Sequence, residues 1–148
     1  MLAAGGAASW LAARDPVANR REVLAGVVPA ILEGALPSDG AQRAQAIGQA
    51  SAAVETAIAA LSPAAQDELA QLFALMAIAP TRFALTGLAA SWRHAGVAEV
   101  SAALQSWRTH RLALLQSAYH ALHDLVTGSW YADPAHWPAI GYGGPPAL

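Results

Sequence analysis

The chain contains no cysteine and no lysine, and only 12% of its 148 residues are charged. Without cysteine it forms no disulfide and has no thiolate nucleophile, iron–sulfur cluster or cysteine-ligated metal, which suits an oxidising periplasm. Soluble proteins are on average about one quarter charged. The low charge indicates either that a partner covers part of the surface or that a GC-rich genome encodes the chain. Both interpretations stay open here.

The charges that are present do not gather on any one segment. The formal net charge is −2 and the isoelectric point is about 6.2. All eight basic residues are arginines, and no basic run is longer than two residues. Proteins that bind nucleic acid carry a basic patch or stripe. The sequence therefore predicts no nucleic-acid partner and no contact with an anionic membrane surface.

Alanine and leucine dominate the composition and β-branched residues are sparse, which favours helices throughout. Proline, glycine and capping residues divide the apolar periodicity into expected helices. Pro29 is expected to kink or split the first of them. The predicted fold is all-α, a single bundle of five or six helices with an extended aromatic, Gly/Pro-rich C-terminal tail. The expected helices cover residues 16–36, 40–60, 63–79, 82–94, 97–107, and a last stretch that starts at Ser106 or Thr109.

The length predicts one domain. Residues 14–132 are expected to form the helical domain and residues 133–148 the extended tail, with no regular structure beyond a single turn. The fourth helix is expected to be anchored by Phe83, Leu88 and Trp92. The last helix has the best-defined apolar face, and its expected buried residues are Leu112, Leu115, Tyr119, Leu122, Val126 and Trp130.

Residues 1–13 are uncharged and apolar. They are too few to span a bilayer, which takes about 20 residues, and they lack the basic region of a signal peptide. They are interpreted as the remnant of a leader, or as a start that is flexible or bound to a partner. Arg20-Arg21 resembles a twin-arginine signal, but Glu33 and the helical periodicity that follows favour the opening of the first helix. No transmembrane span is predicted.

Five histidines raise the question of a metal site. His120, His123 and Asp124 share one helix face, but a catalytic zinc or di-iron centre needs further ligands, such as the Glu-x-x-His pairs of ferritin-like bundles. No such pair is present, so no metal ligand is predicted. No serine nucleophile or glycine-rich phosphate loop has the required strand context either. A free-standing metal-binding protein or enzyme that uses these three residues stays as the alternative hypothesis.

The end of the chain is unusually aromatic. Trp130, Tyr131, Trp137 and Tyr142 lie within the last nineteen residues. Tryptophan and tyrosine are favoured at the centres of interfaces, so these four are predicted to contact a partner, with the Arg108/Arg111 pair available for ion pairs. The alternative is that the tail folds back on the bundle. The two interpretations are compatible if Trp130 points inward and the far end of the tail points outward.

Five segments of the chain resemble the gluconate 2-dehydrogenase subunit 3 family, the small (gamma) subunits of bacterial flavoprotein dehydrogenases. Together they extend over roughly residues 16–146. The Trp-Tyr…Pro…Trp…Gly-Tyr pattern at the end is the most specific part. The segments are Val27–Pro37, Trp107–Arg111, Ala118–Leu122, Trp130–Trp137 and Gly141–Pro146.

The resemblance implies a subunit without catalytic residues or a cofactor of its own. Such a subunit binds, stabilises and helps to export a large subunit of the glucose-methanol-choline (GMC) type, which carries FAD and oxidises an alcohol or sugar. A cytochrome c subunit often receives the electrons. Export by a twin-arginine signal would place the complex in the periplasm or on the periplasmic face of the membrane, and without a leader it would be cytoplasmic. The chain departs from the family in lacking a full signal at residues 1–13.

Overall fold

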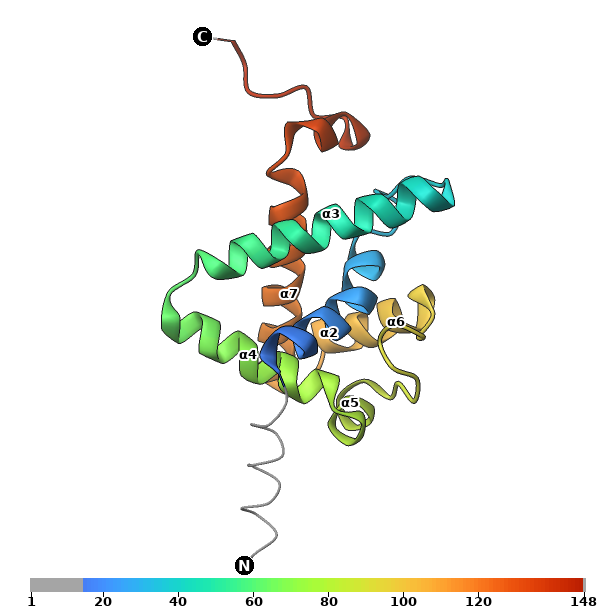
Figure 1. Cartoon of the computed structure of the whole chain (residues 1–148), viewed down its shortest axis with the longest axis vertical. Helices are drawn as coiled ribbons and strands as arrows, with labels where there is room; N and C mark the ends of the chain where they lie inside the picture. Colours follow the sequence, from blue (N-terminus) through green and yellow to red (C-terminus); the bar gives the residue numbers. More distant parts are fainter. Residues whose placement is uncertain (1–14, 148) are drawn as a thin grey trace, which may run out of the picture.

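The computed structural model describes residues 15–147, and within them the chain is helical with no strand (Figure 1). This confirms the all-α prediction. The segment interpreted as a leader remnant, residues 1–13, lies outside the described residues. The helices are α2 (Pro16–Ile31), α3 (Gly40–Ala59), α4 (Pro63–Ala77), α5 (Ala79–Thr86), α6 (Val97–Arg108), α7 (Ala113–Tyr131) and a 3₁₀ helix, η1 (Pro134–Ile140).

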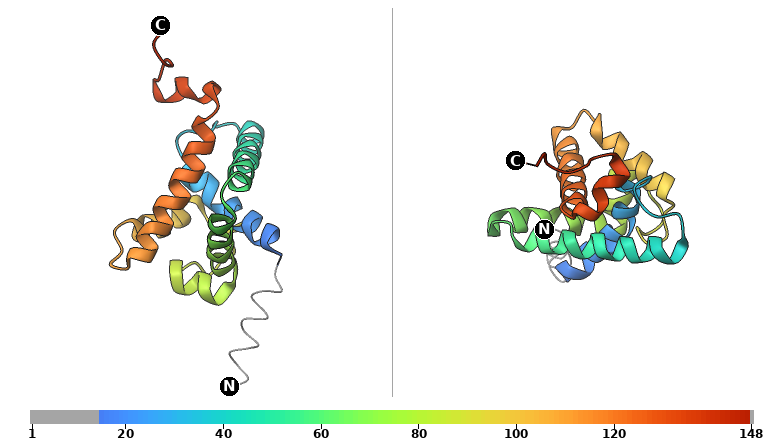
Figure 2. Two further views of the ribbon diagram at one scale, coloured as in Figure 1. Left: turned by 90° about the vertical axis from the view of Figure 1, so that its left-hand side faces the viewer. Right: turned by 90° about the horizontal axis from the view of Figure 1, so that it is seen from above.

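Helix α2 is the centre of the fold and packs against α4, α6, α3 and α7 (Figure 2). Because neighbours surround it, apolar residues are buried on most of its circumference, as expected for a core helix. Its start follows from the sequence: the Asp15 carboxylate accepts a hydrogen bond from the Val17 N–H at 2.9 Å, and Pro16 occupies the first turn. The buried residues of α2 are Asn19, Val23, Leu24, Gly26, Val27, Val28, Pro29 and Ala30.

Three tryptophan side chains close the ends of earlier helices. The last carbonyl groups of a helix have no partner within that helix. The indole N–H of Trp92 donates to the Met76 carbonyl near the end of α4, at 2.7 Å. That of Trp107 donates to the Leu85 carbonyl near the end of α5, also at 2.7 Å. Trp137 does the same for α7, and its indole N–H lies 2.9 Å from the carbonyl oxygen of the final residue, Tyr131.

Gly26 allows α2 to approach the segment between α5 and α6. A Cβ atom at this position would lie 2.7 Å from the Trp92 carbonyl oxygen and 3.0 Å from the Trp92 ring atom Cε3. Real Cβ atoms do not approach backbone oxygen so closely, so a side chain here would push the two segments apart. The ring of Trp92 is 1% exposed and packs in the same core.

Replacing Gly26 with alanine is therefore expected to lower the free energy of unfolding by about 1–3 kcal/mol, the usual cost of overpacking. Urea unfolding followed by circular dichroism measures this change. The matched control is Gly48→Ala in α3, where a Cβ meets no atom within 4 Å. The control should raise stability by up to about 1 kcal/mol, because alanine favours helices. Equal effects of the two substitutions would contradict the close approach.

The fourth predicted helix is wrong in its extent. Residues 82–94 were expected to be helical, but α5 ends at Thr86 because Gly87 adopts a left-handed conformation (φ +73°) and its N–H donates to the Phe83 carbonyl at 2.8 Å. Leu88 and Trp92 are still buried, from an irregular segment. Phe83 was expected to be an anchor, but it is 59% exposed.

The first predicted helix also ends early. Helix α2 runs through Pro29 without being split and ends at Ile31, whereas the periodicity predicted it to Leu36. Gly34 follows with a φ of +88°, in a turn. Leu36 is nevertheless buried from this turn. Glycine takes up this left-handed conformation without steric cost, so Gly34 allows the chain to leave the helix here.

Within residues 15–147, no single helix combines the length and the apolar character needed to cross a membrane. Helices α4 and α5 meet both criteria when taken together, but they bend by 92° at their junction.

Candidate functional site

The C-terminal part of the chain forms a small ordered unit on the end of α7 (Figure 1). We call it the aromatic end, and it consists of Trp130, Tyr131, His136, Trp137, Ile140 and Tyr142. The prediction that no regular structure beyond a single turn follows residue 133 is wrong, because residues 134–140 form the 3₁₀ helix η1. The residues at the two ends of η1 explain why this helix forms. The carboxylate of Asp133 accepts from the Ala135 N–H at 2.9 Å, the next residue is proline, and a glycine in left-handed conformation ends the helix.

Side-chain contacts fix η1 on α7. The imidazole of His136 stacks on the indole of Trp130, with ring centroids 3.5 Å apart and planes 4° from parallel. The Nδ1 atom of His136 lies 2.6 Å from the Trp130 carbonyl oxygen. A carbonyl only accepts, so Nδ1 carries the proton and donates. With the bond from Trp137 to Tyr131, two hydrogen bonds and one ring stack join η1 to α7.

The residues after η1 return over Trp137. The ring of Tyr142 meets that of Trp137 edge to face, with centroids 5.2 Å apart, and the Tyr142 N–H donates to the Trp137 carbonyl at 3.1 Å. Gly144 has a φ of +95°, and a Cβ there would lie 3.4 Å from the Trp137 ring. Glycine therefore lets the chain close over the indole.

The structure gives the four predicted partner-binding aromatics different environments. Trp130 is 4% exposed and belongs to the core, so its ring is not available as the predicted partner anchor. Tyr131 and Trp137 are half-buried. Tyr142 is 47% exposed, and the neighbouring Ile140, which the sequence analysis missed, is 57% exposed. The accessible apolar surface of the aromatic end is thus formed by Ile140 and Tyr142, with part of Trp137.

The two predicted arginines do not join this surface. Arg108 and Arg111 are both exposed and lie between the end of α6 and the start of α7. The aromatic end follows the other terminus of α7, and a helix of 19 residues is about 28 Å long. Arg108 interacts locally, with its Nη1 atom 3.4 Å from the side-chain oxygen of Gln105. The structure therefore divides the predicted residues between two separate surfaces.

A second apolar surface lies near the arginines. We call it the leucine groove: a cleft of about 460 Å³ between α4 and α7, lined chiefly by Leu61, Leu69, Leu72, Leu114 and Leu125. Leu114 is 77% exposed. Leu112, at the start of α7, was expected on the buried face but is 56% exposed, because the helix begins only at the next residue. The sequence analysis did not find this groove, since its two walls come from helices far apart in the chain.

Two of the three residues of the metal hypothesis lie beside Tyr119. The rings of His120 and His123 lie 5.4 and 5.7 Å from the Tyr119 ring, centroid to centroid. Asp124 contacts only one of the two, through its carboxylate oxygen 3.3 Å from the His123 Nδ1 atom. In the part of the chain that the structure describes, no three histidine or carboxylate side chains gather in a way that would hold a metal ion.

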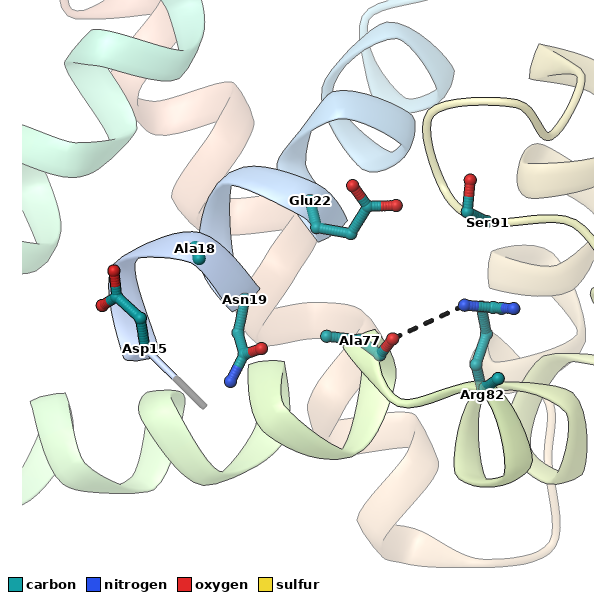
Figure 3. A pocket seen from close by; sticks show the side chains of 8 residues that line it. Asp15, Ala18, Asn19, Glu22, Ala77, Arg82 and Ser91 are labelled. Carbon is teal, nitrogen blue, oxygen red and sulfur yellow. Dashed lines mark hydrogen bonds between the residues drawn. The ribbon is translucent and has the colours of Figure 1, made fainter. Parts of the chain in front are cut away.

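The hollow in Figure 3 brings polar side chains from α2, α5 and the following segment together. One wall carries the buried Arg82, whose guanidinium donates to the carbonyl oxygens of Leu88, Ala77 and Ala89 at 3.3–3.5 Å. Glu22, on the opposite wall, accepts from the Nε atom of Arg93 at 2.7 Å. The Arg82 bonds tie the end of α4 to the segment after α5, and the Glu22–Arg93 bond ties α2 to the same segment. A cation near a helix C-terminus is also stabilising. The hollow therefore has a structural role.

Comparison of the chain with protein families, with curated proteins and with solved structures gives no match.

Proposed function

We propose that this chain is a non-catalytic helical subunit that binds and stabilises a flavin-dependent dehydrogenase of the GMC type. The observation that supports the proposal most directly is the aromatic end. There, two hydrogen bonds and a ring stack hold η1 in place, and the exposed Ile140 and Tyr142 follow from it. An ordered apolar surface of this kind loses little conformational entropy when a partner covers it.

The resemblance of five segments to the small subunits of flavoprotein dehydrogenases also supports the proposal, and so does the low charge of the chain. The leucine groove adds exposed apolar area. FAD and the substrate pocket belong to the partner. A cytochrome c subunit accepts the electrons, and the complex is periplasmic when a twin-arginine leader precedes the chain.

The small subunit stabilises its partner by mass action. Any molecule that binds only the folded form raises its stability, by about 2.7 kcal/mol when the free concentration is 100 times the dissociation constant. We therefore expect the flavoprotein to lose FAD and aggregate at a lower temperature when it is produced alone. The small subunit needs no reactive group for this role, only a surface that fits the folded partner.

The test is purification of the tagged chain from its native host. We expect a yellow, FAD-containing protein to elute with it in a fixed ratio through size-exclusion chromatography, and dehydrogenase activity with an alcohol or sugar to follow the complex. The tag alone, expressed in the same host, is the control for non-specific capture. Elution of the chain by itself as a stable monomer, or oxidation of such substrates by the isolated chain, would contradict the proposal.

A further inference from the structure

Two buried polar side chains lie together in the hollow of Figure 3, which we call the Arg82 hollow. In the described part of the chain, Asn19 and Arg82 are the two buried polar residues, 5% and 7% exposed, and both line this hollow. Its volume is about 460 Å³, which is within the usual range of small-molecule sites. The apolar part of its lining consists of alanines, namely Ala18, Ala77 and Ala79.

The charge of Arg82 has no side-chain carboxylate as a partner. Each ion pair within residues 15–147 uses another basic residue, and residues 1–14 contain no aspartate or glutamate. Its three bonds to carbonyl oxygens are 3.3–3.5 Å long, whereas N–H···O bonds are usually about 2.7–3.2 Å. A guanidinium has five N–H donors, so two of them remain for another acceptor. Because a buried charge is costly unless it is paired, an anion is favoured beside Arg82.

Two further groups at the same hollow favour an anion. No hydrogen bond joins the side-chain amide of Asn19 to another residue of the hollow (Figure 3). Ala79, the first residue of α5, lines the hollow, and no side chain caps this helix. The first N–H groups of a helix have no partner within it, and they lie at the positive end of the helix dipole. A guanidinium, an amide and a helix start therefore surround one space.

The wall formed by α2 is acidic. Glu22 accepts the bond from Arg93 through its Oε2 atom, so its Oε1 atom is available to a second donor. Asp15 lines the hollow from the same helix. Figure 3 shows the Glu22 carboxylate and the Arg82 guanidinium on opposite sides of the hollow, and they form no ion pair with each other. A phosphate dianion would be repelled by two carboxylates, whereas a molecule with one carboxylate and one ammonium group complements both walls.

We propose that the Arg82 hollow binds a small α-amino acid with an uncharged side chain. Its carboxylate accepts hydrogen bonds from Arg82 and Asn19, its ammonium group donates to Glu22, and its side chain lies against the alanines. The hollow is already open in the structure, so no helix has to move for the ligand to enter. The inference goes beyond the proposed function and does not depend on it, because every contact comes from this chain.

The first experiment is an NMR titration of the purified ¹⁵N-labelled chain with L-alanine at millimolar concentrations. We expect saturable shifts of the Asn19 side-chain amide and the Ala79 backbone amide, while the Trp137 Nε1–H resonance at the other end of the molecule stays. Propionate lacks the ammonium group of L-alanine, and ethylamine lacks its carboxylate. We expect each to bind at least about tenfold more weakly, since a hydrogen bond to a charged group is lost. Absence of saturable shifts with L-alanine, or equal affinity for propionate, overturns the inference.

The second experiment repeats the L-alanine titration with variants, using the Ala79 amide as the signal. Arg82→Gln removes the cation, Asn19→Asp places a negative charge beside the bound carboxylate, and Glu22→Gln removes the ammonium acceptor.

We expect each of these three variants to bind at least about tenfold more weakly. The matched control is Glu33→Gln, which breaks a similar pair with Arg43 outside the hollow and should keep the wild-type affinity. If circular dichroism shows that Arg82→Gln does not fold, the other two variants decide. Wild-type affinity in both Asn19→Asp and Glu22→Gln overturns the site, whether or not the chain captures a flavoprotein.

Discussion

Replacement of Trp92 with alanine is expected to lower the free energy of unfolding by about 3–5 kcal/mol, the usual cost of removing a large aromatic side chain from a core. The ring is 1% exposed, and its N–H supplies the Met76 carbonyl with a partner. Small domains are stable by about 5–15 kcal/mol, so the variant loses a large part of its stability. Urea unfolding of the isolated chain measures the change.

Two further variants separate the causes of this loss. Trp92→Phe keeps most of the apolar ring and removes the donor, and the unpaired carbonyl of Met76 should cost about 1–3 kcal/mol. Phe83→Ala removes an aromatic ring that is 59% exposed, and exposed substitutions usually change stability by less than about 0.5 kcal/mol. If Trp92→Ala costs no more than Phe83→Ala, the segment after α5 does not pack against α2 as described.

The second large effect is expected on binding of the flavoprotein. Tyr142→Ala combined with Ile140→Ala removes the two most exposed apolar side chains of the aromatic end. Central aromatic residues of an interface contribute about 2 kcal/mol or more, which corresponds to roughly a thirtyfold or larger rise in the dissociation constant. Calorimetric titration of the flavoprotein with each variant measures it. Stability should change little, since each of the two side chains is about half exposed to solvent.

The matched control for this pair is again Phe83→Ala. Phe83 is an exposed aromatic residue on α5, which lies at the opposite end of the molecule from η1 (Figure 1). We expect the Phe83→Ala variant to bind the flavoprotein with a dissociation constant within about twofold of that of the wild type. A wild-type affinity for the Tyr142/Ile140 variant, together with weak binding by Phe83→Ala, would place the interface on the other end of the bundle.

Local signals predicted most of the helix starts. Ser62 caps α4 through its hydroxyl oxygen, 3.3 Å from the Ala65 N–H, and Pro63 follows in the first turn. The pair at Asp15-Pro16 acts in the same way for α2. The apolar face of α7 was also predicted correctly apart from Leu112, because its spacing is regular over five turns. These features depend on neighbours in the sequence, so one chain is enough to find them.

The features that the sequence analysis did not predict depend on packing between residues that are distant in the chain. The residues after Gly87 are rich in alanine and favour a helix by composition. They form an irregular segment instead, in which Trp92 is buried and its indole N–H donates to the Met76 carbonyl. At the candidate site, the cluster of aromatics was visible in the sequence. The burial of Trp130 beneath His136 and the separation of Arg108 from Tyr142 were not, because both depend on how α7 and η1 sit in space.

The indole bonds that close the helix ends also bear on the order of folding. They join residues 16, 22 and 6 positions apart in the chain, whereas every residue of α3 is at least 54 positions from α7, which it contacts. Closing a short loop costs less chain entropy than closing a long one. We therefore expect the helix termini to be secured while the chain is still partly open, and the α3–α7 crossing to form late, near the rate-limiting step.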